Sequence, residues 1–221
     1  MIGSRFHSSS VTRVADAKPV QLGHAARADG RWRLYAFADA SRIALDSLCE
    51  YLANSPDSPL QCITLRNTDP DSVFDLRAVL QEFHREVRLE DLPALLLPRK
   101  GRYGLVDYEK TFTNDAATDI FDERGVDRER GALVVVRPDQ FVAHVLPLDA
   151  HAELSAFLRP IFRVKQHCAQ HNNIAEEIRR SRVLRRSDTI CRPASKSTYS
   201  DVGLNDRMAG YWRKADACTS D

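Results

Sequence analysis

The sequence predicts an α/β domain in which helices cover a central mixed β-sheet, and three patterns support this fold class. An apolar run at 31–38 is typical of a strand buried on both faces. A stripe of apolar residues at helical spacing follows it. Further along, two β-rich runs at 132–136 and 141–146 are spaced as a hairpin. With 221 residues, the chain is long enough to bury a core without a disulfide or a metal ion.

The first helix and the strand after it are predicted from local signals. We expect a helix that begins near Ser41 as N-cap and ends at the SPDSP sequence of 55–59. Residues 61–66 then predict a second strand, parallel to 31–38 if the helix is a crossover. The buried stripe of the helix comprises Leu45, Leu48, Cys49 and Leu52.

The second half of the domain ends in a hairpin and a helix. Residues 73–86 favour a turn followed by a helix, and 93–113 favour extended segments interrupted at 99–104. In the hairpin, Pro138 suits the second position of a type I turn. Asp149 is the expected N-cap of a last helix, whose apolar stripe comprises Leu154, Phe157, Leu158 and Ile161. Strand, helix, strand, variable middle, hairpin and helix is the order of a thioredoxin-like fold.

Composition and charge exclude several classes of protein. Lys and Arg number 32 and Asp and Glu 31, so a net charge of +1 gives no general attraction for nucleic acid or an anionic membrane. No apolar run is long enough for a membrane helix, and we expect no secretory signal. The absence of a CxxC pair favours reduced thiols in a cytoplasmic protein. The five cysteines are Cys49, Cys62, Cys168, Cys191 and Cys218.

The composition changes near residue 163. The sequence up to that point has an excess of acidic residues, whereas 164–221 is basic and poor in apolar periodicity. Ile174 and Ile178 could share one face of a marginal helix over 164–186, and 187–221 has the composition of a disordered tail.

A thiol-based redox function is disfavoured. A thioredoxin-like enzyme needs a cysteine at the turn after its first strand, where the helix N-terminus lowers the thiol pKa. Residues 37–41 contain none. Cys49 lies on the buried stripe and Cys62 in an expected strand, so both are interpreted as core residues.

Other candidate sites are weak. His167, Cys168 and His171 could share a helix face, but the HExxH glutamate is absent and a metal site is disfavoured. Asp107 and Glu109 could act as paired carboxylates, yet nearby cations favour surface ion pairs. Those cations are Arg99, Lys100, Arg102 and Lys110. Three single histidines, His24, His84 and His144, have no serine or cysteine nucleophile nearby in a recognisable motif. A run of arginines that could contact phosphates comprises Arg179, Arg180, Arg182, Arg185 and Arg186. We treat that run as a solvated face, and no GxSxG, GxGxxG or P-loop motif occurs.

Three long segments, at 5–39, 92–112 and 121–150, resemble the C-terminal region of FAD-dependent aromatic hydroxylases of the phenol 2-monooxygenase and 3-hydroxybenzoate 4-monooxygenase type. The similarity runs from about residue 3 to about residue 162. It implies a thioredoxin-like dimerisation domain without redox cysteines. FAD and NAD(P)H are implied for the parent enzymes, whose preceding domains carry the chemistry. No catalytic, cofactor-binding or metal-binding residue is therefore assigned to this chain.

The resemblance also implies a domain plan and a function. Residues 1–30 are expected to lead from a missing substrate domain, 31–163 to form the dimerisation domain, and 164–221 to be the marginal helix and tail. The leading hypothesis is a non-catalytic dimerisation domain of a flavin-dependent aromatic monooxygenase, present as a fragment or a separate chain, which forms a homodimer. The alternatives are a thioredoxin-fold redox enzyme using Cys49 or Cys62, and a stand-alone module that associates with an intact hydroxylase.

Overall fold

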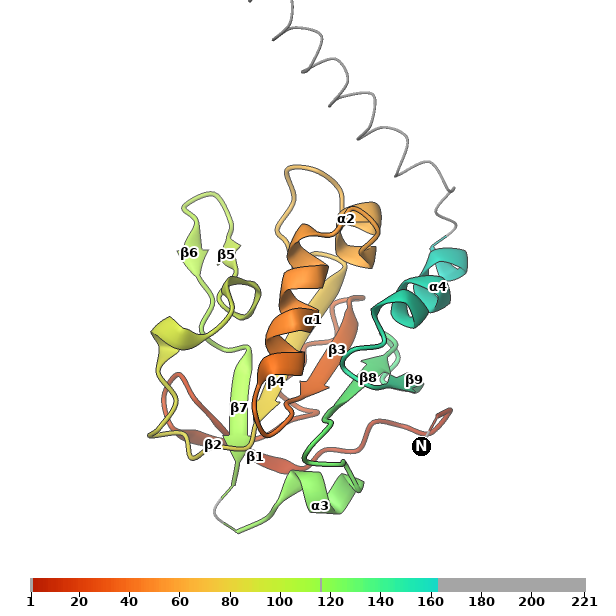
Figure 1. The fold of residues 1–221 in the computed structure, drawn as a ribbon. Helices are drawn as coiled ribbons and strands as arrows, with labels where there is room; N and C mark the ends of the chain where they lie inside the picture. Colours follow the sequence, from red (N-terminus) through yellow and green to blue (C-terminus); the bar gives the residue numbers. More distant parts are fainter. Residues whose placement is uncertain (1, 116, 163–221) are drawn as a thin grey trace, which may run out of the picture. The chain divides into compact units, whose positions relative to one another are not determined.

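The computed structural model describes residues 2–115 and 117–162 and arranges them as a mixed sheet flanked by helices (Figure 1). The expectations for His167, Cys168, His171, the arginine run and the rest of 164–221 lie outside these residues. The strands are β1 (Ser10–Arg13), β2 (Lys18–Gln21), β3 (Trp32–Phe37), β4 (Phe74–Leu80), β5 (Arg99–Lys100), β6 (Leu105–Val106), β7 (Thr111–Asn114), β8 (Ala132–Val136) and β9 (Val142–Leu146). The helices are α1 (Ile43–Asn54), α2 (Pro59–Ile63), α3 (Ile120–Arg124) and α4 (His151–Ile161), with 3₁₀ turns η1 (Leu89–Asp91) and η2 (Ala94–Leu96).

The sheet topology confirms the thioredoxin-like fold class. Among the described residues, seven strands follow the order β2-β1-β7-β4-β3-β8-β9, and β5 and β6 form a separate pair. The strands β3 and β4 are parallel and joined through α1, as a crossover requires. Next to β3 on its other side, β8 and β9 form the antiparallel hairpin, and α4 follows it.

Each face of the sheet has its own core. On one face, the α1 stripe and Leu154 and Leu158 of α4 pack on the alternate residues of β3 and β4. On the other face, the N-terminal segment and α3 cover Tyr35 and Phe37 of β3. The α1 stripe is buried as expected, whereas in α4 Phe157 is half-buried and Ile161 is exposed.

Two predicted elements are wrong, for related reasons. Residues 61–66 are not a strand: the helix α2 begins at Pro59, because Ser58 accepts a hydrogen bond from the backbone N–H of Gln61 at 3.2 Å. Residues 73–86 do not become a helix: 74–80 form β4, which is buried along its whole length and takes the predicted place beside β3. Asp75 and Arg77 alternate with Phe74, Leu76 and Ala78, which is the spacing of a strand.

The expected N-caps are also wrong. The N-cap position of α1 is Arg42, in a left-handed conformation, rather than Ser41, and that of α4 is Ala150 rather than Asp149. The hairpin prediction is confirmed: Gln140 N donates to Arg137 O at 2.9 Å across a turn that has Pro138 at its second position.

The N-terminal residues take part in the sheet. The strand β1 pairs with β2 on one side and with β7 on the other, so part of the expected leading segment 1–30 extends the sheet beyond β7. Near the chain start, Gly3 N donates to Val142 O at 2.8 Å and places this segment along β9. Across the described residues, no helix combines the length and the hydropathy needed to cross a bilayer.

Candidate functional site

The turn from β3 into α1 is where a thioredoxin-like enzyme would carry its reactive thiol, and here it carries a carboxylate. Asp39 Oδ1 accepts a hydrogen bond from Leu45 N at 3.1 Å, and Asp39 Oδ2 accepts one from Ser41 Oγ at 2.6 Å. Burial would raise the pKa of Asp39, but these hydrogen bonds outweigh it and the net shift is downward. A charged carboxylate therefore occupies the helix N-terminus.

The two cysteines of the described residues are not placed for redox chemistry. Cys49 is 2% exposed, and burial, together with the nearby charge of Asp46, raises the pKa of its thiol to about 12. The prediction that Cys49 is a core residue is confirmed. Cys62 lies in α2 rather than in a strand and is half-buried, with Sγ 3.1 Å from the carbonyl O of Pro56.

The same turn does not suit a flavin dinucleotide. A dinucleotide phosphate commonly approaches the helix N-terminus that follows a buried strand, where free backbone N–H groups meet it. In this chain the carboxylate of Asp39 already accepts the Leu45 N–H at that place and would repel a phosphate. The residues of this turn therefore do not fit a flavin dinucleotide.

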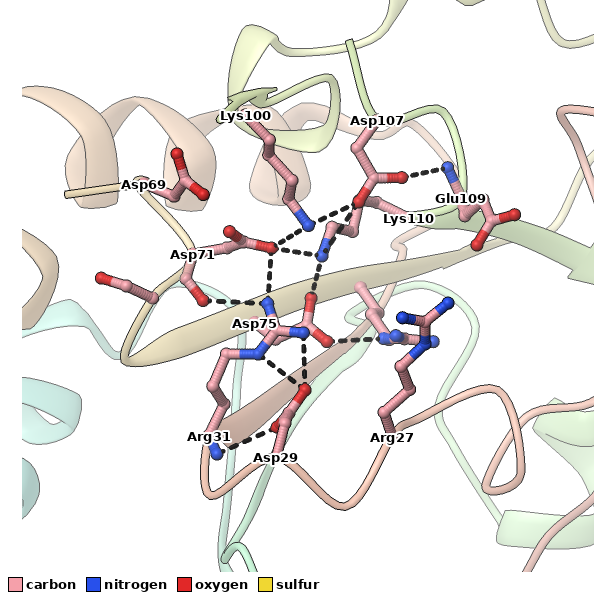
Figure 2. A network of polar contacts seen from close by, with 12 residues as sticks. Arg27, Asp29, Arg31, Asp69, Asp71, Asp75, Lys100, Asp107, Glu109 and Lys110 are labelled. Carbon is pink, nitrogen blue, oxygen red and sulfur yellow. Dashed lines mark hydrogen bonds and ion pairs between the residues drawn. The ribbon is translucent and has the colours of Figure 1, made fainter. Parts of the chain in front are cut away.

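A buried network of charges is the main polar feature of the domain (Figure 2). Asp75 of β4 is fully buried and is bonded by the ammonium of Lys110, which is 2% exposed. Two guanidinium nitrogens also reach this carboxylate: Arg33 Nε and Arg77 Nε both lie 3.0 Å from Asp75 Oδ2. Lys110 Nζ also donates to Asp71 Oδ2 at 2.7 Å, which joins two carboxylates through one ammonium.

The network extends outward to the β5–β6 hairpin. Lys100 of β5 pairs with Asp71, and its Nζ lies 2.7 Å from Asp107 Oδ2 just beyond β6. The backbone N–H of Gly101 donates to Asp69 Oδ1 at 2.9 Å. The hairpin is therefore attached to the body of the domain through Lys100 in β5 and Asp107 just beyond β6 (Figure 2), and through Gly101 in its turn.

The electrostatics of the network favour a structural role. Burial would raise the pKa of Asp71, Asp75 and Asp107, but the ammonium and guanidinium partners lower the pKa of all three, that of Asp107 to about 2. Burial would lower the pKa of Lys100, yet its two carboxylate partners raise it. All of these groups are charged at neutral pH, so none is poised to exchange a proton there.

The hairpin also displays apolar side chains. Tyr103 is 77% exposed and Leu105 is 70% exposed, and the guanidinium of Arg102 lies 5.3 Å from the ring centroid of Tyr103. Leu65 is 74% exposed in the loop that leads to Asp69, the acceptor of the Gly101 N–H. Large apolar side chains gathered at one projecting element are typical of interaction surfaces.

The expected surface pairing around Asp107 and Glu109 is partly wrong. Asp107 and Lys110 belong to the buried network, while Glu109 is exposed and pairs with Arg13 at 3.0 Å. Sequence reasoning missed Asp71, Asp75 and Arg77, and for the last two the signal was charge within the apolar run of 73–80. His144 Nε2 lies 3.5 Å from Glu153, and within 2–115 and 117–162 no three His, Cys, Asp or Glu side chains are placed to hold a metal ion.

The fold and the site define a class: a thioredoxin-like domain whose described residues carry a carboxylate, not a thiol, at the redox position. Residues 1–167 match the family described as the phenol hydroxylase C-terminal dimerisation domain, and the chain belongs to that family.

The relatives agree with this assignment. The chain is 55% identical to a 3-hydroxybenzoate 4-monooxygenase of Comamonas testosteroni over 73% of its length and 27% of the relative's. It is 29% identical to the FAD-dependent monooxygenase terD of Aspergillus terreus, over 74% of its length and 28% of the relative's. The chain thus spans about a quarter of the length of the curated relatives it matches. Among solved structures, the thioredoxin domain of a Bacteroides vulgatus thiol-disulfide oxidoreductase is similar, with 13% identity, a TM-score of 0.45, and coverage of 75% of this chain and 99% of that one.

Proposed function

We propose that this chain is the self-association module of an FAD-dependent aromatic monooxygenase and that it forms a homodimer. The observation that carries the proposal is the match of residues 1–167 to a dimerisation-domain family. FAD and NAD(P)H then belong to the parent enzyme, and catalysis belongs to parts that this domain does not supply. Residues 31–163 are the proposed association domain, and a cytoplasmic location stays a prediction that rests on the cysteine pattern.

The β5–β6 hairpin is the proposed contact surface, with a second copy of this chain as its occupant. A two-fold dimer places the same patch of both subunits face to face, which suits apolar side chains such as Tyr103, Leu105 and Leu65. Stable interfaces bury about 800 Å² per partner around an aromatic and apolar centre. The half-buried ion pairs of Lys100 hold the hairpin before association, so less conformational entropy is lost on binding.

Analytical ultracentrifugation of the full chain at tens of micromolar tests this proposal. We expect a dimer whose dissociation constant rises about tenfold or more when Tyr103→Ser and Leu105→Ser are combined, because both side chains would leave the centre of the interface. Ile43→Ser is the matched control: Ile43 is 72% exposed at the start of α1, away from the hairpin. A strict monomer would contradict self-association, and a double variant that dimerises like the parent would contradict the hairpin as its surface.

The stand-alone alternative is tested by mixing. If the chain serves an intact hydroxylase, addition of such an enzyme should convert the homodimer into a heterodimer during size-exclusion chromatography with light scattering. The redox alternative, which uses Cys49 or Cys62, is disfavoured for Cys49, because burial raises the pKa of its thiol to about 12.

A further inference from the structure

A groove of about 320 Å³ lies over β4 and β7, beside β1 and β2, on the face of the sheet that carries Phe112. Its lining includes Arg13, Val20, Gln21, Arg77, Phe112 and one carboxylate, Glu109. This volume is at the lower end of the range for small-molecule sites. The groove is separate from the hairpin, so binding of a ligand there does not depend on the proposed self-association.

The floor of the groove carries a buried cation that the network does not fully neutralise. The side chain of Arg77 is 8% exposed, and its Nε donates to Asp75 Oδ2 at 3.0 Å. Asp75 is shared with Arg33 and Lys110, so three cations surround one carboxylate. Within the described part of the chain, no acceptor pairs with the two terminal nitrogens of Arg77.

The network as a whole is close to balanced in charge. Among the described residues, the cations that form ion pairs exceed the carboxylates that form them by one, and Asp69, which the network reaches through the backbone N–H of Gly101, balances this excess. The cations are Arg31, Arg33, Arg77, Lys100 and Lys110, and the carboxylates are Asp29, Asp71, Asp75 and Asp107. Arg13 and Arg77 both line the groove, and of the two only Arg77 belongs to the network.

The walls combine apolar and polar character. Beneath the floor, the guanidinium of Arg77 lies 5.9 Å from the ring centroid of the fully buried Phe112. Val20 gives an apolar wall, while Arg13 stands at the rim, where it pairs with Asp16 and Glu109. Arg13 faces two carboxylates, so the rim carries no excess of positive charge, and the attraction for an anion comes from Arg77 alone.

We propose that this groove binds a small organic monocarboxylate with an apolar body. The carboxylate accepts two parallel hydrogen bonds from the terminal nitrogens of Arg77, the strongest geometry that a guanidinium offers. The apolar body lies along Val20 and the neighbouring wall. A guanidinium this deeply buried gains more from an anion than an exposed one, because less water screens the pair.

Titration of the ¹⁵N-labelled full chain with benzoate, followed by NMR chemical shifts, tests the site, and neutral benzamide is the matched ligand control. We expect benzoate to shift the amides of β4 and β7 saturably and benzamide to leave them unchanged. Arg77→Met should weaken benzoate binding about tenfold or more, because it removes a hydrogen bond to a charged group.

A second variant keeps the network intact. Gln21→Glu adds a negative charge at the exposed rim with little change of shape and should weaken benzoate about threefold at low salt through like-charge repulsion. Asn54→Asp, exposed at the end of α1 on the other face of the sheet, makes the same change of charge and should have no effect. Equal shifts with benzamide, equal binding by Arg77→Met, or equal effects of Gln21→Glu and Asn54→Asp would each overturn the proposal. Inorganic phosphate that binds as tightly as benzoate would contradict the apolar part of it.

Discussion

At the scale of single residues, the main feature of the domain is that it buries charged side chains. Asp75 and Lys110 are almost completely removed from water, which is costly for each ion alone and acceptable only because each has several partners. Their burial could not be foreseen from the sequence, since Lys110 stands in a stretch rich in exposed charges. In contrast, the burial of Cys49 followed directly from its place on a helical stripe.

Replacement of Lys110 by Met should strongly destabilise the fold. The variant leaves Asp71 and Asp75 near each other without the ammonium between them, and loss of one partner of a buried ion pair costs about 3–5 kcal/mol. Urea unfolding of the full chain measures this loss of unfolding free energy. Glu109→Gln is the control, because Glu109 is the exposed neighbour and should cost about 0–1 kcal/mol. A Lys110→Met protein as stable as the control would show that the network adds nothing.

At the scale of elements, the sequence was informative where one periodicity dominated. Strand β3, helix α1 and the β8–β9 hairpin were predicted because their apolar spacing has one interpretation. The segments 61–66 and 73–86 were misassigned because short apolar runs fit both periods. Ser58 followed by Pro59 was the signal that distinguished helix from strand in the first of them, because this pair is typical of a helix start.

The contribution of the Ser58 N-cap to the free energy of unfolding should be measurable. Its Oγ accepts from Gln61 N at 3.2 Å and donates to Leu52 O at 2.8 Å, so it closes α2 onto the end of α1. Ser58→Ala should lower the unfolding free energy by about 1–2 kcal/mol. Asp149→Ala is the matched control, because the structure gives the N-cap of α4 to Ala150 and the change should cost no more than about 0.5 kcal/mol. Equal losses in both variants would contradict this assignment of the caps.

At the scale of the whole molecule, the fold class was predictable and the site was not. The order of elements fixed a thioredoxin-like sheet even with two elements misplaced, because β4 filled the position assigned to 61–66. The charge network spans 81 positions, from Asp29 to Lys110, and its longest direct pair, Arg33 with Asp75, joins residues 42 positions apart. No local pattern reports such long-range pairing. The network ties β3, β4 and the β5–β6 hairpin together, so its state of charge affects the stability of the whole domain.

Because the network links these elements, acid should destabilise the whole domain. The carboxylates of Asp71, Asp75 and Asp107 have lowered pKa values in the folded state, so below pH 4 the unfolded chain binds more protons than the folded one. Their contribution to stability is complete above about pH 5 and is lost as the pH falls through 4 toward 2. For Asp107 alone, the fall of its pKa from 3.8 to about 2 corresponds to at most about 2 kcal/mol.

Urea unfolding at pH 7, 5, 4 and 3 should give equal stability at the first two values and a steep decrease below. Asp107→Asn should be less stable at pH 7 and should flatten the decrease below pH 4, whereas an unchanged slope in this variant would mean that its carboxylate is not held by Lys100 and Lys110.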